Sequence, residues 1–175
     1  MATQNLCSRC ASLGKTCCQE TEIYLTVGDI KRIAEFAARL DFYEYRAPAD
    51  PSYLDQEDDP VWATQTMRPD KTRRVLKHQA EQNCLFLTPT GCQLPMTVRP
   101  LVCRIHPFTY TNTGIGVELD DRCQRARPEP GLDLVAALGM SLAQAQAWHR
   151  QLYEEIFILE GVESNEDRHR LRPAV

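Results

Sequence analysis

The sequence has neither an excess of basic residues nor a long apolar run. Its 24 Asp and Glu residues outnumber its 20 Lys and Arg residues, so the formal net charge is −4. A protein whose affinity for nucleic acid comes from neutralising phosphates needs the opposite balance. The sequence lacks a run of about 18 apolar residues that could span a bilayer, and the opening MATQNLCSRC lacks the basic and apolar regions of a secretory leader. We therefore expect a cytoplasmic protein that binds neither nucleic acid nor membranes.

Two glycine-containing stretches lack the full pattern of a nucleotide-binding loop. Gly14–Thr16 reads GKT, but a phosphate-binding loop needs another glycine five positions before Gly14, where the sequence has Arg9. Gly114–Gly116 reads GIG, but a dinucleotide-binding fingerprint needs a third glycine at the position of Leu119. Neither stretch predicts a nucleotide site.

The chain contains eight cysteines. Disulfides rarely persist in a reducing cytoplasm, whereas thiolates bound to a metal do, so metal binding is the first explanation for them. An even number of cysteines is also compatible with the disulfide framework of a secreted protein, which is the alternative. With 175 residues, of which 43% are apolar, the chain is long enough to form one domain with its own core.

The residue pattern predicts a small single domain of the α+β class, in which short strands and hairpins around a cysteine-ligated metal core are packed by a few helices. Thr26 and Asp29 form an approximate capping box that begins a helix reaching about Leu40. Residues 41–70 hold four prolines and predict a long loop with a short helical turn at 41–46. This first half of the chain therefore offers one helix and few strands.

Short strands are predicted further along the chain, at residues 74–77, 84–87, 92–94, 109–110 and 115–119. Basic residues that predict a solvated surface are Arg68, Lys71, Arg73, Arg74 and Lys77. Helices are predicted between residues 132 and 160, and the last of them begins at Ser141 and ends at Gly161. The chain thus divides into a cysteine-cluster metal-binding domain, residues 1–161, and a charged, flexible tail, residues 162–175.

Half of the cysteines lie in the first 20 residues. Two residues separate Cys7 from Cys10, a spacing that lets both sulfurs bind one ion, as in zinc knuckles and iron–sulfur loops. Cys17 and Cys18 are adjacent, and neighbouring side chains of an extended segment point in opposite directions. We therefore expect the adjacent pair to serve two different sites or to include one residue that binds no metal.

Three further cysteines, Cys84, Cys92 and Cys103, lie in the stretch Cys84–Phe108, and Cys123 follows the predicted hairpin. The apolar residues of this stretch can exclude water from a metal site. They are Leu85, Phe86, Leu87, Leu101, Val102 and Phe108. The stretch is therefore the predicted centre of a metal site.

Three polar residues close to Cys103 bear on the chemistry of such a site. Arg99 and Arg104 lie on either side of it, and a guanidinium group can offset the negative charge of several thiolates around one ion. Both arginines could instead be exposed or paired with carboxylates. His106 could complete the site or act as a base toward the Cys103 thiol, but a structural role for this histidine is the simpler interpretation.

The order of these motifs resembles that of the bacterial YkgJ-type cysteine-cluster proteins, which are described as zinc- or iron-chelating domains. The shared order is Cys-x2-Cys, Cys-Cys, Cys-x7-Cys, Arg-Pro-x2-Cys-Arg-x2-Pro-Phe and a final cysteine, and it covers about residues 7–123. The gap between Cys10 and Cys17 is longer than is usual in this family. By resemblance, the metal ligands are drawn from Cys7, Cys10, Cys17, Cys18, Cys84, Cys92, Cys103 and Cys123.

Thiolate ligands suit both zinc and iron–sulfur clusters. The apolar surroundings and the arginines favour a [4Fe–4S] cluster, although the spacing matches neither ferredoxin pattern. Zn²⁺ is the alternative, because a four-cysteine zinc site would tie distant segments into one domain. Eight cysteines could form one such site or two.

Three functions follow from these alternatives. The first is a cytoplasmic metal-binding protein whose [4Fe–4S] cluster acts in redox chemistry or as an accessory to protein modification. The second is a zinc-stabilised module without catalysis, in which the aromatic and acidic residues of 41–62 contact a protein partner. The third, a methylase-like modifying enzyme, follows only from the similarity of the family to the cysteine-rich part of flagellin lysine N-methylases.

Overall fold

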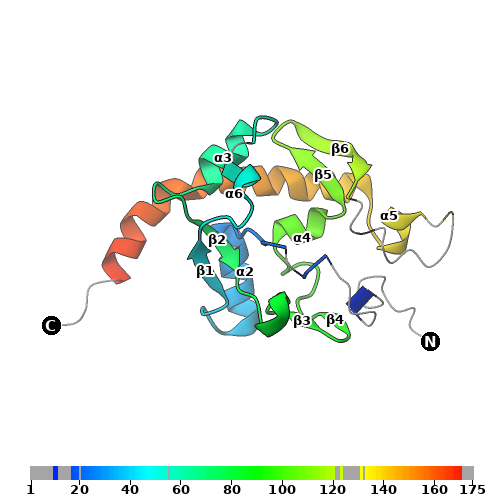
Figure 1. Ribbon diagram of the computed structural model, residues 1–175, viewed down its shortest axis with the longest axis horizontal. Coiled ribbons are helices and arrows are strands. Elements are labelled where there is room, and N and C mark those ends of the chain that lie inside the picture. Colours follow the sequence, from blue (N-terminus) through cyan, green and yellow to red (C-terminus); the bar gives the residue numbers. More distant parts are fainter. Residues whose placement is uncertain are drawn as a thin grey trace.

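The structure is a computed structural model. It describes residues 10–11, 17–19, 21–54, 56–120, 123, 131 and 133–170, with side chains up to residue 157. Helices combine with three two-stranded antiparallel sheets in this described part of the chain (Figure 1). The chain is a small single domain of the α+β class, as the sequence predicts.

The longest helix, α6 (Leu142–Arg170), runs along the molecule and packs against elements from several parts of the chain (Figure 1). Its contacts are with α2 (Val27–Ala37), α3 (Pro60–Thr66), α4 (Leu101–Ile105) and the hairpin of β5 (Phe108–Thr111) and β6 (Gly114–Leu119). The first core cluster lies along this helix and includes Tyr24, Trp62, Leu101, Ile105, Leu152 and Ile156.

The backbone of α6 stays helical to Arg170, so the predicted end of this helix at Gly161 is wrong. The glycine lies inside the helix, where it costs about 1 kcal/mol relative to alanine without ending the helix. Residues 171–175 lie outside the described residues. The division into a domain of residues 1–161 and a flexible tail of residues 162–175 stays a prediction.

The capping box at the start of α2 is confirmed. The Asp29 backbone N–H donates to Thr26 Oγ1 (2.9 Å), and the Thr26 N–H donates to Asp29 Oδ2 (3.1 Å). The helix ends at Ala37, earlier than predicted, because Ala38 adopts a left-handed conformation with a φ of 52°.

A strand replaces the helical turn that the sequence predicts at residues 41–46. This strand, β1 (Tyr43–Arg46), is antiparallel to β2 (Arg73–Leu76), and Tyr43 lies opposite Leu76. The predicted helical turn is wrong because β1 is stabilised by β2, which lies far away in the sequence. Residues near 41–46 therefore do not indicate this pairing.

Two arginines of β2, Arg73 and Arg74, are buried, which contradicts the predicted solvated surface. Arg73 donates to Glu22 Oε2 (2.7 Å) and stacks on Tyr53, with its guanidinium carbon 4.0 Å from the ring centroid. Arg74 Nε donates to the Leu25 carbonyl (3.1 Å). Both side chains therefore contribute to the interior.

The second core cluster lies between α2 and the short strands. It includes Leu25, Ile33, Phe42, Leu76, Cys84, Phe86 and Leu94. The remaining elements are η1 (Pro51–Leu54), η2 (Ala80–Gln82), β3 (Leu87–Thr88), β4 (Gly91–Cys92) and α5 (Leu134–Ala137). The strands β3 and β4 form a tight hairpin that Gly91 permits, since its φ of 110° is unfavourable for residues with a side chain.

Candidate metal centre

Four cysteines from four separate segments come together at the second core cluster. Cys84 is buried in this cluster, and Cys18, Cys92 and Cys103 pack against it. We refer to these four residues as the thiol cluster. Their apolar neighbours limit the access of water, so the thiol cluster has the surroundings that a cysteine-ligated metal requires.

Backbone hydrogen bonds place Cys18, Cys84 and Cys92 in this cluster. The Cys84 N–H donates to the Cys18 carbonyl (3.0 Å), which fixes the N-terminal arm beside the segment that follows η2. The Leu87 N–H donates to the Cys84 carbonyl (2.9 Å), and Leu87 lies opposite Cys92 in the β3–β4 hairpin. The hairpin therefore returns Cys92 toward Cys84.

The fourth member, Cys103, is positioned by α4. Pro100 precedes the helix, and its carbonyl accepts the Cys103 N–H (2.9 Å). The Leu101 N–H donates to Asp29 Oδ1 (3.1 Å), so the carboxylate that caps α2 also holds the first turn of α4. Sequence reasoning identified the role of Asp29 in α2 but missed its role in α4, which only the packing of the two helices reveals.

The carboxylate of Asp29 belongs to a network that joins α2 to α6. Arg32 donates to Asp29 Oδ1 (2.7 Å) and to Glu155 Oε1 (2.6 Å), and Thr26 Oγ1 hydrogen-bonds Glu155 Oε2. Burial raises the pKa of Asp29. Burial also raises the pKa of Glu155, but hydrogen bonds from Arg32, Thr26 and Gln151 outweigh it, so the net pKa is lowered. The network therefore supports the helix that carries Cys103.

Burial and the neighbouring sulfurs both raise pKa values within the thiol cluster. Burial raises the pKa of Cys84 to about 12, and the neighbouring sulfurs of Cys18 and Cys92 add to the rise. Burial raises the pKa of Cys103 well above its usual range, and the other three sulfurs again contribute. At neutral pH without metal, Cys84 and Cys103 are therefore protonated thiols, and a bound metal must displace their protons.

The two arginines beside Cys103 have different roles. Burial raises the pKa of Cys92, but the guanidinium group of Arg99, which hydrogen-bonds this side chain, opposes the rise. Arg104 is buried and donates to the carbonyls of Arg99 (2.6 Å) and Thr97 (2.7 Å). Arg99 therefore offers its charge to the thiol cluster, whereas Arg104 holds the backbone that leads into α4.

Replacing Arg99 with glutamine is expected to weaken metal binding about tenfold, the lower end of the usual effect of residues that support metal ligands. Without the guanidinium group the pKa of Cys92 rises further, so protons compete more strongly with the metal. Half-release of metal on stepwise acidification should therefore occur at a higher pH than in the wild type, as measured with a metal-sensitive dye. Arg39→Gln, which changes an exposed ion pair with Asp41, is the control. Equal half-release pH values for Arg99→Gln and wild type would contradict this role.

The other predicted ligands are not placed in the thiol cluster. Cys123 is buried in a separate core cluster with Leu134 and Leu138. Cys10 and Cys17 are half-buried, and Cys7 lies outside the described residues. The full set of eight ligands therefore stays a prediction.

Within the ranges that the structure describes, no three His, Cys, Asp or Glu side chains form a group that could hold a metal ion as they stand. The donor set nevertheless fits a metal, because four sulfurs are the ligands of structural zinc and of iron–sulfur clusters. Cys18, Cys84, Cys92 and Cys103 are the residues that would hold it.

His106 follows α4, and its Nδ1 lies 3.8 Å from Asp120 Oδ2. A nucleophile–base pair of Cys103 and His106 would need a readily formed thiolate. The raised pKa of Cys103 opposes that chemistry. The raised pKa therefore gives no support to a Cys103–His106 nucleophile–base pair.

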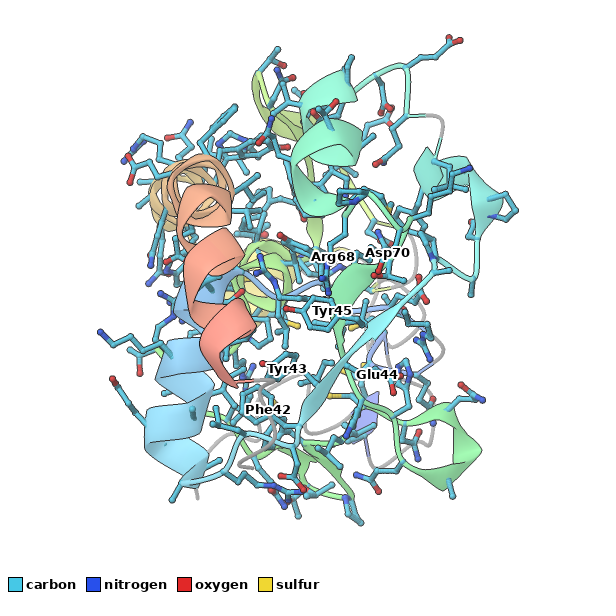
Figure 2. The ribbon with its side chains drawn as sticks, turned by 90° about the vertical axis from the view of Figure 1, so that its left-hand side faces the viewer. Phe42, Tyr43, Glu44, Tyr45, Arg68 and Asp70 are labelled. Carbon is cyan, nitrogen blue, oxygen red and sulfur yellow. The ribbon has the colours of Figure 1, made fainter. Side chains whose placement is uncertain are left out.

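The aromatic residues of 41–62 pack mainly against the protein itself. Trp62 is buried, and its ring centroid lies 5.3 Å from that of Tyr24. The half-buried Tyr43 and Tyr45 contact each other, and Arg68 stacks over Tyr45 at 4.3 Å from the ring centroid (Figure 2). Trp62 is therefore part of the core, and contact of this segment with a protein partner stays a prediction.

The fold is an α+β domain with a cluster of thiols in its apolar core. These are the features of a cysteine-cluster metal-binding protein. A family model, CxxCxxCC, described as a "putative zinc- or iron-chelating domain", matches residues 6–124, which is more than half of the chain. The chain belongs to this family, and the resemblance seen in the sequence is confirmed. Searches of curated proteins and of solved structures gave no match. None of the helices in the described ranges has the length and apolar character to span a bilayer.

Proposed function

We propose that this chain binds a [4Fe–4S] cluster through the thiolates of Cys18, Cys84, Cys92 and Cys103. The carrying observation is the packing of these four cysteines from four separate segments in one apolar cluster. Four cysteine thiolates are the usual ligand set of such a cluster. Arg99 supports the proposal as well, because hydrogen bonds and positive charge near the sulfurs tune the reduction potential of a cluster.

The proposed role is redox chemistry, or an accessory function in protein modification, in the cytoplasm. The apolar surroundings of the thiols would protect the cluster from water and set its potential. Reversible reduction and reoxidation of the purified protein, followed by electron paramagnetic resonance, would support a redox role. A cluster that is lost on the first reduction would contradict it.

The test of the proposed cluster is analysis of iron and acid-labile sulfide in protein purified without oxygen. About four iron and four sulfide ions per chain, with a brown colour, are expected for one [4Fe–4S] cluster. About eight of each would indicate a second cluster on the remaining cysteines. Colourless protein without sulfide would contradict the proposal.

A zinc-stabilised interaction module is the second candidate. It is favoured by the positions of the four thiols, which lie in the N-terminal arm, after η2, in β4 and in α4. One tetrahedral Zn²⁺ bound there would cross-link four segments of the chain. One or two zinc ions per chain, without iron or sulfide, would support this candidate.

A further inference from the structure

Three short extended segments lie side by side next to the thiol cluster. Gln19 pairs with Asn83, and His78 pairs with Cys84, both in antiparallel bridges. The Cys84 N–H donates to the Cys18 carbonyl (3.0 Å), so Cys18 lies opposite Cys84 in the register set by the first bridge. Residues directly opposite each other in antiparallel strands project from the same face. Cys18, Cys84 and His78 therefore form one row of side chains.

A side-chain hydrogen bond on the opposite face agrees with this register. Gln19 Nε2 donates to Asn83 Oδ1 (2.8 Å), which places these two side chains together. Because successive side chains alternate between faces, Cys18 and Cys84 share the other face. Nothing in the spacing of the sequence links His78 to the cysteines.

The pairing of His78 with Cys84 is of the close type. The Gln79 N–H donates to the Asn83 carbonyl (2.7 Å), and the Leu85 N–H donates to the Lys77 carbonyl (3.0 Å), so the hydrogen bonds flank the pair on both sides. In such pairs the two Cα atoms are about 4.5 Å apart and the side chains are closest. The imidazole thus lies beside a member of the thiol cluster.

The ring nitrogens of His78 have distinct roles. Nε2 lies 3.1 Å from the Thr21 carbonyl, which can only accept, so Nε2 carries the proton of the neutral ring and Nδ1 carries a lone pair. Nδ1 is buried and has no hydrogen-bond partner among the described residues. Leaving a buried acceptor without a donor costs free energy. Histidines that bind metals commonly donate their other N–H to a backbone carbonyl, as His78 does.

We propose that His78 is a ligand of the metal centre through Nδ1, so that the centre combines sulfur and nitrogen donors. This inference rests on the proposed metal-binding function and revises its ligand set to three of the four thiolates and the His78 imidazole. A neutral imidazole in place of one thiolate lowers the negative charge of the ligand set by one unit. This suits a centre at which Arg99 is the cation that contacts a thiol. Zinc and iron–sulfur clusters both accept imidazole beside thiolates.

X-ray absorption of the full chain loaded with Zn²⁺ tests the proposal. Zn²⁺ is a suitable probe because it is four-coordinate and binds both donor types. The expected result is about three sulfurs at about 2.3 Å and one nitrogen at about 2.0–2.1 Å with the scattering pattern of an imidazole ring. This measurement on the wild type does not depend on the folding of any variant.

His78→Phe should lose the nitrogen signal and bind Zn²⁺ at least about tenfold more weakly in competition with a chelator. The matched control is His149→Phe. His149 also bonds a backbone carbonyl, that of Thr111 (2.7 Å), but it lies on α6 in contact with Tyr110 and Tyr153. The control should bind Zn²⁺ as the wild type does.

Four sulfurs and no nitrogen around Zn²⁺ in the wild type would overturn the role of His78 and leave the metal centre intact. Equal Zn²⁺ affinity of the two histidine variants would overturn it as well. A wild-type chain that binds neither Zn²⁺ nor iron would contradict the proposed function itself. These outcomes separate failure of the ligand assignment from failure of the metal centre.

Discussion

Replacing Cys103 with serine is expected to remove one metal centre from the protein. Cys103 packs in the same core cluster as Cys18, Cys84 and Cys92, and the hydroxyl group of serine is a poor ligand for zinc and iron–sulfur clusters. If the chain carries one centre, the metal content should fall close to zero. If it carries two, the content should fall by about half. Metal and sulfide analysis of protein purified without oxygen makes the measurement.

Cys123→Ser is the matched control for this loss. Cys123 is also buried, but it packs with Leu134 and Leu138 in a separate core cluster. The variant should keep the centre that Cys103→Ser loses. If both variants lost the same metal, the two cysteines would serve one site, and the grouping of Cys18, Cys84, Cys92 and Cys103 would be wrong.

The second large effect is expected for Arg32→Met, which leaves two neighbouring carboxylates without their shared cation. Arg32 bridges Asp29 and Glu155, and Asp29 is completely buried. Removing one partner of a buried ion pair commonly costs 3–5 kcal/mol, because the remaining charge stays desolvated. Arg32 is partly exposed, so we expect the free energy of unfolding at neutral pH to fall by about 3 kcal/mol. Denaturant unfolding measures the change.

This loss of stability should depend on pH in a defined direction. Without Arg32, the pKa values of Asp29 and Glu155 both rise, since the cation that favours their charged forms is gone. A group whose pKa is higher in the folded state than in the unfolded state stabilises the folded protein at pH values below its unfolded pKa. That contribution is lost as the pH rises through the folded pKa. The deficit relative to wild type should therefore be largest at neutral pH and shrink toward pH values of about 4.

Arg39→Gln is the control for the loss of an ion pair at the surface. Arg39 and Asp41 are 2.5 Å apart but exposed, so removing their interaction should change the free energy of unfolding very little. Comparing each variant with wild type at the same pH cancels the shared contribution of the metal. A cost for Arg32→Met as small as that for Arg39→Gln would show that the buried network contributes little to stability.

The elements that local residues specify were predictable from the sequence. The start of α2 follows from Thr26 and Asp29, whose reciprocal hydrogen bonds span three positions. The short helix that carries Cys103 lies between Pro100 and Pro107, as the effect of proline on helix ends predicts. The β5–β6 hairpin turns at Asn112 and Thr113, within the predicted turn. Each of these features depends on neighbours only a few positions apart.

Features that depend on distant residues were not predictable from the sequence. The strand β1 forms because β2 supplies its hydrogen-bonding partner, and no spacing in the sequence indicates that pairing. Burial of Arg73 depends on Glu22 and Tyr53, which come from two other segments. The continuation of α6 beyond Gly161 was also not predicted, because the glycine was taken as the end of the helix.

By itself the sequence determined the chemistry of the donors and the family, because cysteines provide thiolates wherever the chain places them and their order is visible without a fold. Only the tertiary structure decided which of them meet. It brought Cys18, Cys84, Cys92 and Cys103 into one apolar cluster and aligned His78 with two of them. The physical reason is that strand pairing and core packing set these contacts, most clearly for Cys18, which precedes Cys84 by 66 positions, and such contacts leave no periodic trace in the sequence.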